Sequence, residues 1–107
     1  MGFFNAIFGG KSINKNVATL IKEGAFLVDV RSQGEFADGH VKGSTNIPLD
    51  QISSQLSKFK SKEQIIVFCR SGMRSSQAKS ILQQNGFTNV TNGGTWHTIN
   101  TIISKNS

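Results

Sequence analysis

Cysteine, proline and tyrosine are scarce in this 107-residue sequence, which contains one cysteine, one proline and no tyrosine. A single cysteine cannot form an internal disulfide, and it gives no Cys-x-x-Cys spacing, so we expect no bound metal and no cofactor. Free thiols persist in reducing compartments, which predicts a cytoplasmic location. Covalent chemistry at this cysteine would also find no second cysteine in the chain to resolve it.

Long apolar runs are missing as well. The first eleven residues are rich in phenylalanine, but their apolar segment is too short to span a bilayer and lacks the basic start and cleavage site of a secretory signal. We therefore expect no membrane span. We interpret residues 1–11 as a Phe-rich N-terminal arm and residues 12–107 as a single domain, long enough to enclose one modest core.

Acidic residues are few, with six Asp and Glu against 12 Lys and Arg, which gives a net charge of +6. The basic residues are spread along the chain, with no dense cluster beyond residues 58–62 and little aromatic interleaving. We therefore expect no nucleic-acid partner, and interpret the positive charge as a solvated surface that can attract a small anionic substrate.

What the sequence does contain is an alternation of short apolar runs with segments of helical spacing. Strands are predicted at 26–30, 43–48, 65–69 and 87–92, and a glycine turn at 93–94. A first helix is predicted to begin after a cap at Ser12 or Asn14, to carry the apolar residues of 17–21 and to be ended by Gly24. Further helices are predicted at 49–59, 75–85 and 96–103, and a short helix or turn at 33–37. Strands separated by helices predict an α/β fold, with an open parallel sheet covered by helices on both faces.

The sequence is organised around residues 64–86, where a β-branched run ends at Cys69 and is followed by a short loop and a helix. In parallel sheets the ligand site lies at the carboxyl ends of the strands, where Cys69 falls. Backbone amides and the dipole of the following helix favour negative charge there, which predicts a reactive thiolate. The alternative is a buried structural cysteine, but the residues that follow favour a reactive one.

The loop after Cys69 has the composition of an anion-binding site. Gly72 lets the backbone approach closely, so that successive amides form a nest, while Arg74 supplies a planar charged fork and Arg70 a second positive charge. Hydroxyl donors, one of them a candidate N-cap for the helix, are supplied by Ser71, Ser75 and Ser76. We expect this loop to lower the pKa of the thiol.

Several segments taken together resemble the single-domain rhodanese family of sulfurtransferases, over about residues 12–96. They are LVDVR at 27–31, EF at 35–36, GHVKG at 39–43, NIP at 46–48, CRSGMRS at 69–75 and GGTW at 93–96. The resemblance implies a rhodanese-like fold in which Cys69 is the nucleophile and alternates between thiolate and persulfide. It also implies that the loop amides cradle the outer sulfur, with Arg74 and Arg70 contacting an anionic donor.

The expected substrate-binding residues are therefore Arg70, Ser71, Gly72, Met73, Arg74 and Ser75. A second group is interpreted as structural support near the site, through ion pairs and hydrogen bonds that hold the strand end and the neighbouring loop. Its members are Asp29, Arg31, Glu35 and His40.

The predicted activity is transfer of a sulfane sulfur from thiosulfate or a persulfide donor, through a Cys69 persulfide, to an external acceptor. Cyanide, a small thiol or a protein cysteine would serve as that acceptor. The alternative is a non-catalytic sulfur-carrier or partner-binding module, which the basic surface and the Phe-rich arm motivate. Phosphatase or arsenate reductase activity ranks lower, because a Cys-x5-Arg loop needs arginine at position 75, where this chain has serine.

Overall fold

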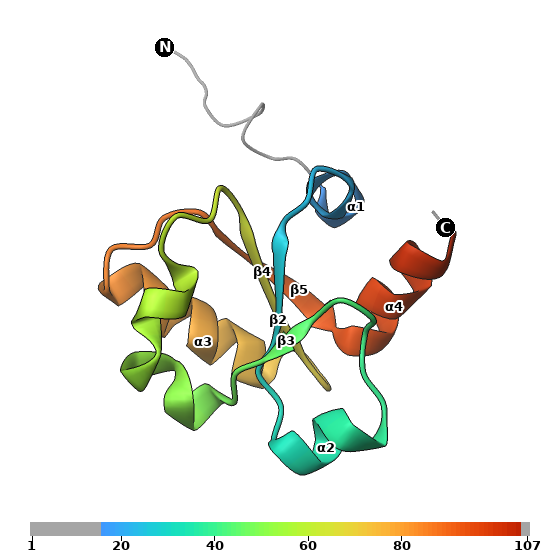
Figure 1. Ribbon diagram of the computed structural model, residues 1–107, viewed down its shortest axis with the longest axis horizontal. Helices are drawn as coiled ribbons and strands as arrows, with labels where there is room; N and C mark the ends of the chain where they lie inside the picture. The colour runs from blue at the N-terminus through green and yellow to red at the C-terminus, as the bar shows by residue number, and fades with distance from the viewer. Residues whose placement is uncertain (1–15, 106–107) are drawn as a thin grey trace.

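A computed structural model describes residues 16–105 of the chain (Figure 1). The predicted Phe-rich arm at residues 1–11 lies outside the described residues. In chain order the elements are α1 (Val17–Lys22), β2 (Phe26–Asp29), α2 (Gln33–Asp38), β3 (Thr45–Asn46), two 3₁₀ helices (Leu49–Ser54 and Leu56–Phe59), β4 (Ile65–Cys69), α3 (Met73–Gln84), β5 (Val90–Thr95) and α4 (Trp96–Lys105).

The four strands form one parallel sheet, as predicted, and their order in it is β3-β2-β4-β5. The chain runs outward from β2 to β3 and then crosses to the other side of β2 to form β4. The carboxyl ends of β2 and β4 therefore lie at the point where the connections diverge, which is where open α/β sheets bind ligands. Cys69 is the last residue of β4.

Helices cover both faces of the sheet, with α3 and the 3₁₀ helices on one side and α1 and α4 on the other (Figure 1). All five residues of β4 are buried, and their side chains alternate between two apolar clusters. Ile65, Val67 and Cys69 belong to the cluster under α3, whereas Ile66 and Phe68 belong to the cluster under α4. Burial on both faces explains why this strand is an uninterrupted apolar run.

The single amphipathic helix predicted over 49–59 is wrong, because the segment forms two 3₁₀ helices. Gln55 lies between them with φ −125° and ψ 31°, outside the helical region. The Ser54 hydroxyl bonds the carbonyl of residue 51 and so competes with regular helical bonding. Within each half the apolar residues are three apart, the period of a 3₁₀ helix: 49 and 52, then 56 and 59.

The first helix begins later than predicted. Its N-cap is Asn16, whose side chain accepts the backbone N–H of Thr19 at 2.8 Å, whereas the predicted caps Ser12 and Asn14 lie outside the described residues. The helix ends before Gly24, which takes a positive φ of 92° as a C-terminal glycine commonly does.

The last strand and its glycines also differ from the prediction. β5 spans Val90–Thr95, so Gly93 and Gly94 lie inside the strand and not in a turn after it. Val67 pairs with Asn92 and Phe68 with Gly94, which leaves Gly93 as the extra residue of a β-bulge. A Cβ atom on Gly93 would lie 2.8 Å from Ile66 Cγ2, closer than packed carbon atoms allow.

Replacing Gly93 should therefore destabilise the fold. We expect Gly93→Ala to lower the free energy of unfolding by about 1–3 kcal/mol, because the new methyl group overpacks the core between β4 and α4. Urea denaturation followed by circular dichroism measures the change. The matched control is Gly34→Ala in α2, whose Cβ would meet no atom within 4 Å. A Gly93→Ala protein as stable as the control would contradict this account of the bulge.

Candidate active site

Cys69 is fully buried at the carboxyl end of β4, and the loop that follows turns back over its sulfur. Gly72 takes the left-handed conformation, with φ 98°, and donates its backbone N–H to Cys69 Sγ at 3.0 Å. A side chain at position 72 would be strained at this φ, which explains why glycine occupies it. The burial alone would also suit a structural cysteine, but this hydrogen bond gives the sulfur a polar environment.

The helix after the loop starts earlier than predicted. α3 begins at Met73 and not at 75, and its N-cap is Gly72, which has no side chain to make a cap bond. The predicted serine N-cap is therefore wrong. As a result Arg74 and Ser75 lie in the first turn of α3 rather than in a loop. Met73 in the same turn is 72% exposed.

Ser75 is the side chain that approaches the sulfur. Its hydroxyl is buried and lies 3.6 Å from Cys69 Sγ. Burial favours the neutral thiol and by itself would raise the pKa of Cys69. Hydrogen bonds from the Ser75 hydroxyl and from the backbone amides of Ser75, Gly72 and Ser71 outweigh that effect, so the pKa of Cys69 is lowered from its ordinary value. The site therefore makes ionisation of the thiol easier than in a free cysteine, without a contacting base.

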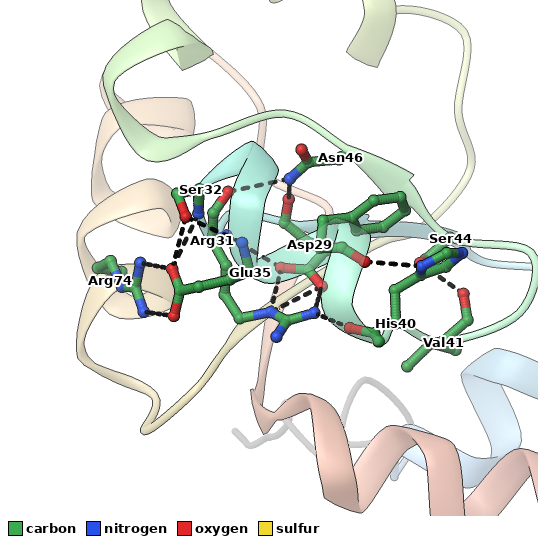
Figure 2. Close-up of polar contacts among 11 residues, drawn as sticks. Asp29, Arg31, Ser32, Glu35, His40, Val41, Ser44, Asn46 and Arg74 are labelled. Carbon is green, nitrogen blue, oxygen red and sulfur yellow. Dashed lines mark hydrogen bonds and ion pairs between the residues drawn. The ribbon is translucent and has the colours of Figure 1, made fainter.

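Arg74 faces α2 and forms a two-pronged ion pair with Glu35, at 2.7 and 3.0 Å (Figure 2). The Ser32 backbone N–H donates to the same carboxylate at 3.0 Å, and the Ser32 hydroxyl accepts the N–H of Glu35, which completes a capping box at the start of α2. The bond from Arg74 is the main reason that the pKa of Glu35 falls to about 2. Glu35 in turn raises the pKa of Arg74.

Asp29 and Arg31 pair with each other at the end of β2, and both are buried. The Arg31 guanidinium bonds the Asp29 carboxylate at 2.7 Å (Figure 2). It also donates to the carbonyl of Gly39 at 2.7 Å and lies 4.4 Å from the centre of the Trp96 ring. The Asn46 side chain donates to the carbonyls of Asp29 and Arg31, both at 2.9 Å. These contacts join the end of β2 to β3, α2 and α4, and they place no carboxylate against the thiol.

His40 is exposed, and its side chain contacts Phe36 of α2. Its ring stacks on Phe36 with a centroid distance of 3.9 Å, and its Nδ1 lies 2.8 Å from the Phe36 carbonyl oxygen. Arg70 is exposed at the start of the loop and lines a polar cleft of about 230 Å³ together with Arg31, Glu35, Asp38, Gly39, Trp96 and His97. A second groove, of about 490 Å³, has Arg74 on its wall. The Glu35–Arg74 pair thus borders both depressions.

Asn92 was not expected at this site, yet it contacts the residues around the sulfur. Its Oδ1 lies 2.7 Å from Ser75 Oγ, and its Nδ2 lies 3.3 Å from the carbonyl of Gly72. No local pattern pointed to it, because Asn92 and Ser75 are 17 residues apart and meet only when β5 aligns beside β4.

Over residues 16–105, no group of three or more His, Cys, Asp or Glu side chains could hold a metal ion. In the same part of the chain, every helix is too short or too polar to cross a membrane.

The model of the rhodanese-like domain family matches residues 14–94. Thiosulfate sulfurtransferase PspE of Escherichia coli K12 is 35% identical over 69 residues, 63% of this chain and 66% of that protein. The putative sulfur carrier protein YrkF of Bacillus subtilis 168 is 30% identical over 66 residues, 62% of this chain and 36% of that protein. A solved structure, "rhodanese with anions from E. coli", aligns with a TM-score of 0.64 and 31% identity, covering 70% of this chain and 91% of that one.

The matched regions span 54%, 65% and 66% of the lengths of three curated relatives, so this chain covers between half and two thirds of those proteins. The four-stranded parallel sheet with helices on both faces agrees with the fold of the solved structures.

The Glu35–Arg74 pair predicts a specific pH dependence of stability. Folding lowers the pKa of Glu35 from 4.5 to about 2, so the charged pair stabilises the fold above the unfolded carboxyl's pKa and loses this effect as the pH falls toward 2. Glu35→Gln keeps a capping side chain but removes the charge. We expect this variant to be less stable than the wild type by up to about 1 kcal/mol near neutral pH, because both partners are partly exposed.

Urea denaturation at several pH values measures the difference between the two proteins. The difference should shrink between about pH 5 and pH 2, where the wild-type carboxylate takes up its proton. A stability gap that stays constant over this range would show that the charge of Glu35 is not what stabilises the contact.

Proposed function

The chain belongs to the rhodanese-like domain family, and on that premise we propose that it is a sulfurtransferase that carries sulfur as a persulfide on Cys69. The observation that supports this proposal best is the polar surrounding of the sulfur: the Gly72 amide donates to it at 3.0 Å, the Ser75 hydroxyl lies 3.6 Å away, and the thiol pKa is lowered. We further propose that residues 12–107 form the transferring domain and that it works in a reducing compartment, where its single thiol stays free.

In the first step the Cys69 thiolate attacks the outer sulfur of a donor such as thiosulfate. A new S–S bond forms, the bond between the two sulfurs of thiosulfate breaks, and its electron pair leaves with sulfite. The product is a Cys69 persulfide with its negative charge on the outer sulfur. The total charge is −3 before and after the step, so no proton, oxidant or reductant is needed.

In the second step a nucleophile attacks the outer sulfur of the persulfide. With cyanide, thiocyanate forms and the electron pair of the S–S bond returns to Cys69 as a thiolate. A small thiol or a protein cysteine would accept the sulfur in the same way. Because Cys69 is the only cysteine, the acceptor must come from outside the chain.

Arg70 is the first basic contact that we propose for an anionic donor, because it is exposed in the cleft beside the loop. Arg74 already gives two N–H groups to Glu35, but a guanidinium has five, which leaves donors for a second anion. Cys69 has no exposed surface in this arrangement, so the loop at 70–72 and the first turn of α3 must move aside before a donor reaches the sulfur.

A sulfur-carrier role is the second candidate. It is supported by the similarity to a putative sulfur carrier protein and by the full burial of Cys69, which would slow reaction with free thiosulfate. In that case a partner protein would open the loop and deliver or remove the sulfur. The two candidates share the Cys69 persulfide and differ in the rate of turnover with small donors.

The proposed persulfide can be observed directly by mass spectrometry. After incubation with thiosulfate and removal of the excess, we expect the intact mass to rise by one sulfur atom, and added cyanide should return it to the starting mass with release of thiocyanate. Cys69→Ser is the control and should gain no sulfur. Wild-type protein that stays unmodified by both thiosulfate and a small persulfide donor would contradict the proposal.

Steady-state turnover separates an enzyme from a carrier, because a carrier would turn over free thiosulfate slowly.

The role of Arg70 is tested by substitution. Arg70→Ala should raise the KM for thiosulfate several-fold if Arg70 binds the anion, while leaving the thiol reactive toward uncharged alkylating agents. Lys79→Ala, which removes a cationic side chain farther along α3, serves as the matched control. An unchanged KM in the Arg70 variant would remove Arg70 from the donor site.

A further inference from the structure

Asn92 makes contacts that the reaction steps above leave without a purpose. It lies on β5, half-buried, and its amide oxygen accepts the backbone N–H of Gly94 at 2.9 Å. The same oxygen lies 2.7 Å from Ser75 Oγ, and the amide nitrogen points to the carbonyl of Gly72 at 3.3 Å. Because only oxygen can accept the Gly94 N–H, this bond fixes which end of the amide faces Ser75.

The Ser75 hydroxyl has one hydrogen but more than one acceptor within reach. Asn92 Oδ1 is nearest at 2.7 Å, the carbonyl of Gly72 lies at 3.0 Å, and Cys69 Sγ lies at 3.6 Å. When Cys69 is a neutral thiol, its S–H can donate to Ser75 Oγ while the Ser75 hydrogen points to Asn92. When Cys69 is a thiolate, it has no hydrogen to give, and its charge draws the Ser75 hydrogen to itself.

We propose that Asn92 is a positioning residue that holds the hydrogen of the Ser75 hydroxyl whenever Cys69 Sγ is uncharged and gives it up when the thiolate forms. The change is a rotation about the Cβ–Oγ bond of Ser75 and requires no backbone movement. In the persulfide the negative charge is on the outer sulfur and Sγ is uncharged, so the Ser75 hydrogen stays with Asn92.

Asn92 therefore competes with the thiolate for one hydrogen bond. The thiol and the persulfide keep the bond between Ser75 and Asn92, whereas the thiolate loses it. Asn92 thus makes the thiolate less stable relative to the persulfide. This difference keeps the thiolate reactive toward a sulfur donor. This last consequence rests on the proposed sulfurtransferase function, but the effect on the thiol itself does not.

Other charged groups surround the thiol and must be kept constant in a test. They are Arg70 in the loop, Arg74 on α3 with Glu35 behind it, and Asp29 at the end of β2; β5 contributes no titratable side chain, and α4 contributes His97 at the cleft. Over residues 16–105, no hydrogen bond joins any of these side chains to Sγ. None of them is changed in the variants below, so their contributions cancel.

The test is the pH profile of Cys69 alkylation by iodoacetamide, whose midpoint reports the thiol pKa. Ser75→Ala should move the midpoint up, because the thiolate loses a donor. Asn92→Ala should move it down by roughly half a pH unit, because the Ser75 hydrogen then loses its nearest competing acceptor and only the Gly72 carbonyl still competes with the thiolate. In the Ser75→Ala background, Asn92→Ala should have no effect.

Asn89→Ala is the matched control. The Asn89 side chain also donates to backbone carbonyls, those of Lys62 and Glu63, but at the opposite end of the sheet, and its loss should leave the midpoint unchanged. An upward or absent shift in Asn92→Ala, or the same downward shift without Ser75, would show that Asn92 only supports the loop and would overturn the proposal.

Asn92→Asp keeps the proposal testable if the alanine variant does not fold. The carboxylate should hold the Ser75 hydrogen more firmly than the amide does. With Ser75 present, both this stronger hydrogen bond and the added negative charge raise the midpoint, whereas in the Ser75→Ala background only the charge acts. The rise should therefore be larger with Ser75 present. Equal rises in the two backgrounds would overturn the proposal. Alkylation needs no sulfur donor, so the two experiments can fail separately. A failed alkylation test would leave the proposed Cys69 persulfide standing, and protein that forms no persulfide would still give a valid alkylation profile.

Discussion

The hydrogen bond from the Gly72 amide to Cys69 Sγ is the contact on which the arrangement of this site depends. A sulfur buried at the end of an apolar strand would remain a neutral thiol unless polar groups turned back to meet it. The left-handed conformation of Gly72, φ 98°, makes that reversal, and it starts α3 so that the amide and hydroxyl of Ser75 also approach the sulfur. The loop and the first helical turn therefore act as one donor surface.

Two further groups of contacts hold this surface in place. On one side, Glu35 joins the first turn of α3 to α2, and the buried Asp29–Arg31 pair fixes the end of β2 from which α2 departs. On the other side, the β-bulge at Gly93 aligns β5 so that the Asn92 side chain reaches the carbonyl of Gly72 in the loop. The thiol thus lies at the switch point of the sheet, and the groups that lower its pKa are the loop amides and the first turn of α3.

The sequence predicted the features that depend on local pattern. The run at 65–69 is β-branched and continuous, so a buried strand ending at Cys69 was correct, and the alternation of strands and helices predicted the α/β fold. The helix over 49–59 failed because spacings of three and four look alike in a short segment. The strand at 90–95 was misplaced because two glycines argue against a strand unless a bulge in the sheet uses them. Contacts between residues far apart, such as Glu35 with Arg74, leave no local pattern to detect.

The central claim is that the loop after Cys69 is shaped to hold a second sulfur atom. A crystal structure of the protein after treatment with thiosulfate tests it most directly. We predict an added sulfur bonded to Cys69 Sγ and lying within hydrogen-bond reach of the backbone amides of residues 70–74. An added sulfur that lies outside this loop would contradict the account, and so would a Cys69 that remains a free thiol after prolonged treatment with excess thiosulfate.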